Sequence, residues 1–492
     1  MNAAATLRRT LVRLSWSSAV VLVASTGIAS AQPPVELPVV VPPVAGAPEA
    51  IVTVPTPPPT PIPPPAQLPG LPPAVGFGGY PSAPPPLRDA NTFPELNSLL
   101  HDNLTIRLRG KGTLRPYGLL RGDLDFATNK FNDIQNPFFV LPADPSFLNG
   151  TGNVPAKTYD PNYSLYPRLS RLGLEYYSKP IADLGGLTPS GRLEADFLVP
   201  NTSVAGFNTE SREFVRLRLA YAQLQRGEFT LVVGQDWDII APLIPTIDDN
   251  TLLWNAGNMG DRRPIVKLLW DHDFGAGMRL QVQNGIALGD AIDNLDLDQN
   301  GFRDQEDSGL PTYQGRVGLV LPSIWGANQP VIAGVWGLLT QDSTNKPVGT
   351  SGRTHFYGRA IGGDLRVPIT DRLAFQAEAF YGRNLDDFRG GIGQGINSKT
   401  GETIETKGGW LELIYRPFTH YQVSVGGSAD DPVNSDIPVG GRTANYVWYV
   451  GNRFPLGDGI VVGADYEHWT TEYSGFRAGR ASRVKLFLSL AF

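Results

Sequence analysis

Residues 482–492, SRVKLFLSLAF, form the stretch that decides the fold of this chain. Every second position is apolar, with Arg483 before Val484 and Lys485 after it. The apolar positions are Val484, Leu486, Leu488, Leu490 and Phe492. A period of two residues predicts a β-strand with one apolar face. A strand of this kind at a chain end would leave an unpaired edge, so we expect it to pair with the first strand of a closed sheet.

The same alternation extends back to about residue 113. Most of the alternating segments have 9–14 residues, which suits tilted strands that cross a bilayer, whereas soluble sandwiches use strands of about five or six residues. Sixteen segments are predicted, approximately at 113–127, 168–178, 191–200, 214–225, 229–237, 264–274, 278–288, 311–322, 331–341, 354–366, 372–384, 407–418, 421–430, 443–454, 460–473 and 481–492.

The two faces of these segments differ in chemistry. In residues 212–225, REFVRLRLAYAQLQ, the apolar Val215 and Leu217 alternate with Arg216 and Arg218. A soluble barrel buries its apolar face, whereas a membrane barrel turns it to lipid and encloses a polar lumen. Alternation alone fits both barrels. The length and number of the strands, the export signal described below and the strand at the end of the chain favour the membrane barrel.

The connecting segments provide a check on this interpretation. Links after even-numbered strands are mostly short, and links after odd-numbered strands are long: roughly 128–167, 201–213, 238–263, 289–310, 342–353, 385–406, 431–442 and 474–480. Outer-membrane barrels have short periplasmic turns and long extracellular loops. The sequence therefore predicts an all-β, transmembrane antiparallel β-barrel of about 16 strands. An alternating last strand that ends in Phe492 also resembles the signal read by the outer-membrane assembly machinery.

The N-terminal part has a different composition. A basic start, a short apolar core and small residues up to Ala31 predict a signal peptide over 1–31, cleaved after Ala31. Residues 32–91 are rich in proline and predict an extended periplasmic linker, for which a spacer, a tether or a contact with peptidoglycan are alternatives. A short helix is predicted over 92–103, and the barrel over 104–492. The expected location is the bacterial outer membrane.

Composition excludes several other classes of protein. The chain has 492 residues, no cysteine and no long apolar run of the kind a spanning helix needs. Without residues 1–31, 38 basic residues stand against 47 acidic ones, a net charge of −9. We therefore expect no nucleic-acid partner and no stabilisation by disulfides.

Five short motifs resemble the trimeric porin superfamily, and most closely its DcaP-like branch. They are SRLGLEYYS (170–178), GRLEADF (191–197), RLRLAYAQL (216–224), VVGQDWD (232–238) and RRPIVKL (262–268). The resemblance implies a homotrimer of sixteen-stranded barrels, each with a third long loop that folds inward and narrows the pore. DcaP-like proteins carry a helical coiled-coil segment where this chain has its proline tract.

Charged residues on the third long loop and on the facing strands are the candidates for a constriction. Opposed acidic and basic groups create a transverse field in a narrow pore, which orients polar solutes and sets selectivity. Ordinary lumen-facing charges that balance one another are the alternative. The predicted constriction residues are Asp248, Asp249 and Asp261 on the loop, and Arg216, Arg218, Arg192 and Arg168 on the strands.

The fourth long loop contains DLDQNGFRDQED at 296–307. Its oxygen-bearing residues have the spacing of an EF-hand-type calcium loop, with Gly301 at the sharp turn. An acidic surface loop of this composition by chance is the alternative. The predicted ligands of a structural Ca²⁺ are Asp296, Asp298, Asn300, the carbonyl of Phe302, Asp304 and Asp307.

These features predict a porin, a passive diffusion channel for small hydrophilic solutes, with small anions such as dicarboxylates favoured by the arginine-rich strands. The alternative is a structural or adhesive surface barrel with a plugged pore and calcium-ordered loops. No enzyme is expected, because the five histidines lack metal-ligand spacing and no G-x-S-x-G element occurs. A phospholipase barrel would need Ser and His on its outer face, and His468 shows no partner in the sequence.

Overall fold

The structure is a computed structural model that describes residues 105–108, 112–149, 154–155, 157, 159–198, 214–247, 251–293, 295–323, 325 and 327–492. The predicted signal peptide, proline-rich linker and short helix lie outside these residues, so they stay predictions.

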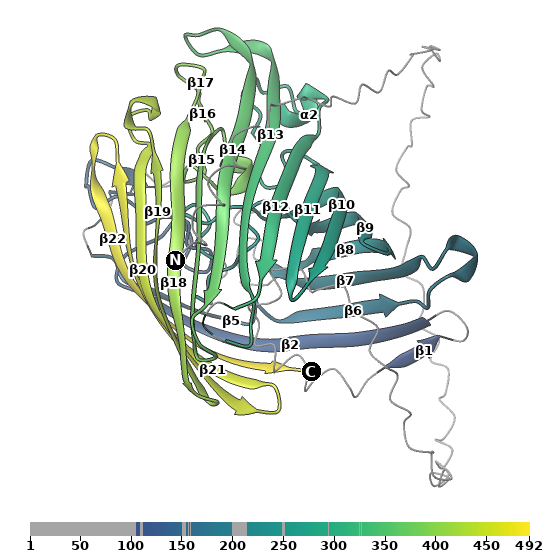
Figure 1. Ribbon diagram of the computed structural model, residues 1–492. Coiled ribbons are helices and arrows are strands. Elements are labelled where there is room, and N and C mark those ends of the chain that lie inside the picture. Colours follow the sequence, from purple (N-terminus) through teal and green to yellow (C-terminus); the bar gives the residue numbers. More distant parts are fainter. Residues whose placement is uncertain are drawn as a thin grey trace, which may run out of the picture. The chain divides into compact units, whose positions relative to one another are not determined.

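The described residues form a closed antiparallel β-barrel of 16 strands (Figure 1). The main sheet has eighteen strands, of which β5 and β6 together make one crossing and β1 (Ile106–Leu108) is a short strand on the edge of β2. The crossings are β2 (Gly112–Ala127), β5 (Asn162–Tyr166) with β6 (Arg171–Tyr177), β7 (Thr188–Leu198), β8 (Phe214–Arg226), β9 (Phe229–Trp237), β10 (Arg262–Gly275), β11 (Met278–Ala287), β12 (Thr312–Leu321), β13 (Val331–Val348), β14 (Arg353–Pro368), β15 (Leu373–Arg383), β18 (Glu405–Phe418), β19 (Tyr421–Pro432), β20 (Arg442–Gly457), β21 (Ile460–Tyr473) and β22 (Phe476–Ala491).

The first and last crossings close the barrel. Residues 119–127 of β2 pair with residues 483–491 of β22 in antiparallel register. Beyond this ladder, Gly118 and Phe492 exchange two backbone hydrogen bonds of 2.8 and 2.9 Å. The predicted pairing of the last strand with the first is confirmed, and it removes the sheet edges that lipid could not satisfy.

The barrel is apolar outside and polar inside. On β22, Val484, Leu486 and Leu488 are 40%, 46% and 56% exposed, while Arg483 and Lys485 between them are fully buried. This arrangement is the reverse of a soluble barrel and is the one expected of a barrel in lipid. Among the described residues, no helix is long and apolar enough to cross a membrane.

Most strand boundaries agree with the sequence prediction, and β9 and β21 match it residue for residue. The second crossing is broken at Pro167, because proline cannot donate to the ladder. β13 and β22 are longer than predicted, since they continue past the apolar stretch into hairpins. Short elements occupy the connections: β3 (Leu148–Asn149), β4 (Val154–Pro155), β16 (Ile396–Asn397), β17 (Glu402–Thr403), α2 (Asp304–Ser308), η2 (Ala182–Leu184), η3 (Asp386–Phe388) and η4 (Asn434–Asp436).

The third long loop, residues 238–261, folds into the lumen, as predicted. Its backbone lacks ladder partners, and side chains of the inner wall replace them. The N–H of Leu243 donates to Glu378 on β15 (2.7 Å), and the N–H of Thr246 donates to Glu412 on β18 (3.0 Å). The loop also contacts β12, where Gln314 accepts the N–H of Ile239 (2.8 Å), and β20, where Arg453 donates to the carbonyl of Thr246 (2.8 Å). The described part of the loop therefore crosses the lumen from β12 to β20.

The first long loop, residues 128–161, also turns inward, which the sequence reading did not anticipate. The N–H of Val140 donates to Thr471 on β21 (2.9 Å), and Phe131 packs edge-on against Trp469 at 5.5 Å between ring centroids. Together with the third loop it forms an apolar core inside the barrel that includes Leu243 and Leu253.

Candidate pore constriction and loop sites

Five arginines gather beside the third long loop, and we call them the arginine cluster: Arg168, Arg216, Arg218, Arg262 and Arg389. β8 supplies two of them, β10 starts at the third, and the segment between β5 and β6 supplies the fourth. The fifth comes from the sixth long loop, residues 384–404. Period-2 alternation turns the two on β8 to the lumen while their apolar neighbours face lipid.

Carboxylates are outnumbered in this cluster. Asp196 binds Arg216 and Arg218, each at 2.8 Å, and Glu194 binds Arg218 at 2.6 Å. The predicted Arg192 lies one strand away, at 3.1 Å from Glu194. The cluster also contains Asp261, and Asp133 lies near Arg168, so five arginines stand beside four carboxylates, of which Glu194 is shared with Arg192.

Two buried arginines retain donors without acceptors in the described part of the chain. Arg168 donates to the side-chain oxygen of Asn136, but its Nε and Nη1 have no hydrogen-bond partner. Arg262 is 3.3 Å from Asp261 through Nε, and its Nη1 has no partner. Buried guanidinium groups without acceptors are costly, so this corner of the lumen favours an additional anion.

The predicted acidic side of the constriction is only partly described. Asp248 and Asp249 lie outside the described residues. Asp261 is buried and binds Arg389 at 2.8 Å. Burial alone would raise the pKa of Asp261, but Arg389 and Arg262 beside it hold that pKa below its usual range.

Aromatic side chains from three segments cover the cluster. The guanidinium of Arg262 lies 4.8 Å from the ring of Trp237, and that of Arg389 lies 5.1 Å from Phe138 and 4.9 Å from Trp254. Sequence reasoning missed Arg389, because an isolated arginine in a long loop carries no periodic signal. Arg262 stood inside the quoted motif RRPIVKL, yet its spacing alone gave it no role.

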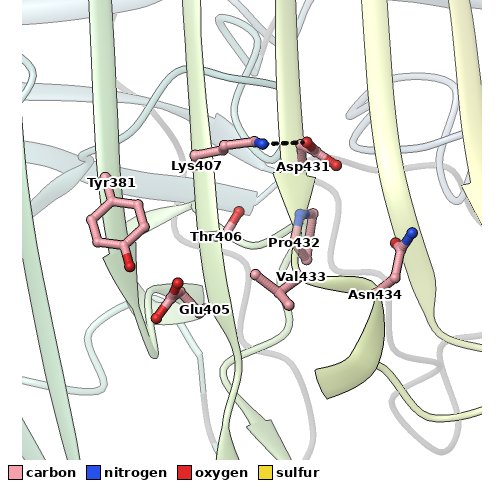
Figure 2. A pocket seen from close by; sticks show the side chains of 8 residues that line it. All are labelled: Tyr381, Glu405, Thr406, Lys407, Asp431, Pro432, Val433 and Asn434. Carbon is pink, nitrogen blue, oxygen red and sulfur yellow. Dashed lines mark ion pairs between the residues drawn. The ribbon is translucent and has the colours of Figure 1, made fainter.

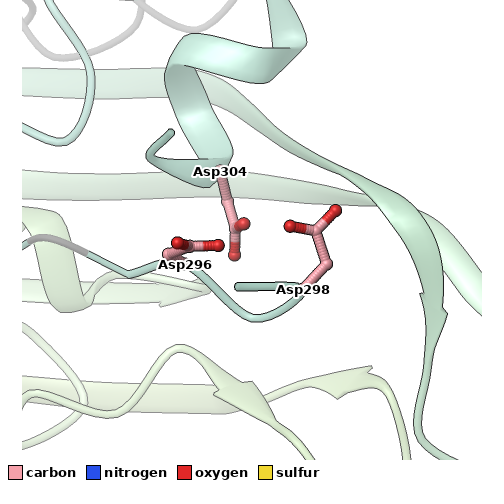
Figure 3. A group of neighbouring side chains, drawn as sticks. All are labelled: Asp296, Asp298 and Asp304. Carbon is pink, nitrogen blue, oxygen red and sulfur yellow. The ribbon is translucent and has the colours of Figure 1, made fainter. Parts of the chain in front are cut away.

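In the fourth long loop, residues 288–311, three of the predicted calcium ligands converge. Carboxylate oxygens of Asp296, Asp298 and Asp304 lie within 4.8 Å of one another (Figure 3). Asn300 and Asp307 bind each other, with 2.6 Å between the amide nitrogen and the carboxylate. The helix α2, which begins at Asp304, was not anticipated. Calcium binding stays a prediction, since the geometry brings the carboxylates together and tests nothing about the ion.

A second acidic group lies between the fourth and sixth long loops. Asp290 and Asp293 face Asp387, which is paired with Arg263 at 2.5 Å. Burial, and then the neighbouring carboxylates, raise the pKa of Asp290 to about 8 and the pKa of Asp293 to about 6. Protonation therefore stabilises this contact between the two loops.

His468 does have a partner on the outer face. It stands opposite Ser482 on β22, with 3.1 Å between Nδ1 and Oγ, and Tyr466 approaches the same hydroxyl at 3.0 Å. Strand pairing brings these residues together from 14 positions apart in the sequence. The serine hydroxyl is shared between two side chains, so its hydrogen-bonding capacity is used within the patch.

The closed sixteen-stranded barrel, the lipid-facing apolar surface and the inward third loop are the features of the porin fold. Solved structures agree: this chain is similar to the outer membrane channel DcaP of Acinetobacter baumannii, with 15% identity and a TM-score of 0.59 over 79% of this chain and 100% of that chain. It is also similar to Salmonella typhi OmpF in complex with daunomycin, with 12% identity and a TM-score of 0.50 over 79% and 100%. No family model and no curated protein matches the chain. At these identities the likeness is one of fold, and at that level the predicted resemblance is confirmed.

Proposed function

We propose that this barrel is a passive outer-membrane diffusion channel that prefers small hydrophilic anions, with dicarboxylates as the first solutes to test. The observation that carries the proposal is the excess of arginine over carboxylate in the arginine cluster, at the point where the third long loop narrows the lumen.

The placement of the third loop supports a path along the arginine side. The loop lies on the wall of β15 and β18, where Glu378 and Glu412 accept its N–H groups. Those two carboxylates are thereby buried beneath the loop and engaged in hydrogen bonds. Accessible charge remains on both sides of the loop: the side chain of Arg216 on β8 is 32% exposed, and that of Arg389, from the loop that joins β15 to β18, is 20% exposed. A solute that passes the third loop would meet these two cations.

Anion selectivity follows from this geometry. A cation beside a narrow aqueous path, with low-dielectric walls around it, lowers the energy of a passing anion and raises that of a passing cation. Two carboxylates on one solute could engage Arg216 and Arg389 in turn. Homotrimer formation belongs to the same proposal.

The decisive measurement is the zero-current potential of the purified protein in a planar bilayer under a KCl gradient. We expect water-filled channels and a zero-current potential whose sign shows a preference for chloride. Addition of a dicarboxylate should block the conductance or shift that potential. A cation-selective channel would contradict the anion preference.

A second candidate function is a structural or adhesive surface barrel with a plugged pore. One observation favours it: the first and third long loops pack together inside the lumen, through Phe131, Leu243 and Leu253 among others. Absence of any conductance, together with no swelling of liposomes in sugar solutions, would support that function over diffusion.

A further inference from the structure

A pocket opens on the outer face of the barrel, where β15, β18 and β19 approach the long loops (Figure 2). It has a volume of about 350 Å³. Tyr381, Lys407 and Asp431 line it from three neighbouring strands and stand in direct register, all on the lipid-facing parity. The pocket therefore belongs to the outside of the barrel and not to the pore.

The height of the pocket places it at the edge of the bilayer. On β18 the outward positions below Lys407 are apolar, with Leu411 and Leu413 exposed, and the strand ends at Phe418. At about 3.3 Å per residue and a tilt of about 40°, these 11 residues span roughly 28 Å, slightly more than the apolar band of about 25 Å. Lys407 thus lies where lipid headgroups begin, on the side of the long loops.

The charges around the pocket are accessible, and their ion pairs lie at the surface. Lys407, with a side chain 69% exposed, lies 3.3 Å from Asp431. Arg383 lies 2.7 Å from Glu405, and Arg359 stands opposite Arg383 on β14. Exposed ion pairs contribute little stability, so a phosphate can take the place of the carboxylates as partner of the three cations.

Directly below the pocket, a row of four small outward residues crosses four strands. They are in register with one another: Gly363, Ala379, Gly409 and Ala429. Larger side chains border the row, with Tyr381 above and Leu411 below. Because the row lacks long side chains, it forms a shallow shelf on an otherwise bulky apolar surface, which suits acyl chains.

We propose that this pocket and shelf bind a phosphorylated glycolipid of the outer leaflet. Its phosphate would lie between Lys407, Arg383 and Arg359, and its acyl chains would lie over the small residues. Sugar hydroxyls can donate to Glu405 and Asp431 once the cations turn to phosphate. The position beside the extracellular loops, and so in the outer leaflet, favours a glycolipid over a glycerophospholipid. The site is independent of whether the pore conducts.

Binding of bis-phosphorylated lipid A to the mature protein in detergent, measured by native mass spectrometry, tests the proposal. The triple variant R359A/R383A/K407A should bind roughly tenfold more weakly or worse, because charge-assisted hydrogen bonds to phosphate are lost. The matched control K179A/R226A/R372A removes three cations from the short-turn end and should bind as the wild type does. A379L, which fills the shelf with a lipid-compatible side chain, should also weaken binding.

Three results would overturn the proposal. Unchanged affinity in both the triple variant and A379L would show that lipid A binds elsewhere. Equal affinity for phosphatidylglycerol would show that any anionic lipid suffices. In the variant A379C, any disulfide must join two copies through residue 379, because the natural chain has no cysteine. Formation of such a dimer without lipid would show that a second copy covers this face.

Discussion

Two inner walls of the barrel carry the same kinds of charged side chain and use them differently. One wall, which we call the matched wall, is formed by β2, β21 and β22: Arg483 bridges Asp125 at 3.0 Å and Glu467 at 3.0 Å, and Lys485 lies 3.2 Å from Asp123. Each of these side chains is fully buried. In the arginine cluster, which begins at the crossing next to β2 and continues to β10, cations exceed carboxylates and Arg216 remains accessible.

The difference shows how burial separates structural charge from functional charge. The first long loop covers the wall of β21 and β22, where Phe131 packs on Trp469, and it excludes water from the ion pairs beneath. Charges removed from water must be matched, since each unpaired ion costs several kcal/mol. Charges beside an aqueous path are free of that requirement, so an excess of one sign can persist there and act on solutes.

The largest effect should follow from breaking the matched wall. Arg483→Met leaves Asp125 and Glu467 buried without their cation, and we expect a loss of about 3–5 kcal/mol in the free energy of unfolding. Urea titration of the barrel refolded in lipid vesicles, followed by tryptophan fluorescence, measures it.

Lys130→Ala is the control for that experiment. Lys130 forms an exposed pair with Asp160 at 3.2 Å, and its loss should cost at most about 1 kcal/mol. Equal stability of the two variants would show that the matched wall is no more demanding than the surface.

Reversing one accessible charge of the arginine cluster should change transport. A smaller loss of stability than in Arg483→Met is also expected, because Arg216 binds the buried Asp196, which keeps Arg218 as a partner. For Arg216→Glu, two charge units at about 8 Å in a water-like medium raise the energy of a passing anion by about 1 kcal/mol, or roughly fivefold in the permeability of chloride, and lower that of a passing cation by a similar amount. The zero-current potential should move toward cation preference. Arg477→Glu, on the exposed end of β22, makes the same charge change away from the cluster and should leave the potential where it was.

The sequence predicted the strands of both walls and the inward third loop, but not the contacts between distant segments. Alternation and link length were sufficient for the sixteen crossings, because strand period is a local property of residues such as Val215 and Arg216. The inward third loop followed from its apolar residues. The same reasoning applied to Phe138, Phe139 and Val140 would have indicated that the first loop folds inward as well. Arg389 and the pairing of His468 with Ser482 depend on contacts between distant segments, and no local pattern encodes them.

The acidic group between the fourth and sixth long loops has the opposite excess of charge from the arginine cluster, because carboxylates outnumber cations there. The folded-state pKa values of about 8 for Asp290 and about 6 for Asp293 lie above the ordinary 3.8. The stabilisation is therefore complete below about pH 4 and is lost as the pH rises through 6 and 8. The groups facing them, Asp342, Asp386 and the pair of Arg263 with Asp387, do not reverse this sign.

Hydrogen exchange of residues 288–311 measures that loss. After correction for intrinsic exchange rates, protection at pH 5.5 should exceed protection at pH 8.5 by roughly an order of magnitude. Asp290→Asn mimics the protonated acid and should flatten the dependence. A loop that is better protected at pH 8.5 would show that repulsion among these acids is not what controls it.

The smallest effect concerns the three convergent carboxylates of the same loop. If Ca²⁺ binds there, it would hold Asp296 and Asp304 together and fix the loop to β13, because Asp298 already accepts the N–H of Asn345 at 2.5 Å. Affinity in the range of about 10⁻⁴–10⁻³ M, typical of extracellular modules, is expected. Exchange of residues 295–308 should slow with millimolar Ca²⁺ but not with Mg²⁺, and the effect should vanish in D296N/D298N and persist in the exposed control D183N. Identical hydrogen exchange with Ca²⁺ and with a chelator would contradict calcium binding. The loop would then carry an excess of negative charge without a bound cation, as the arginine cluster carries an excess of positive charge.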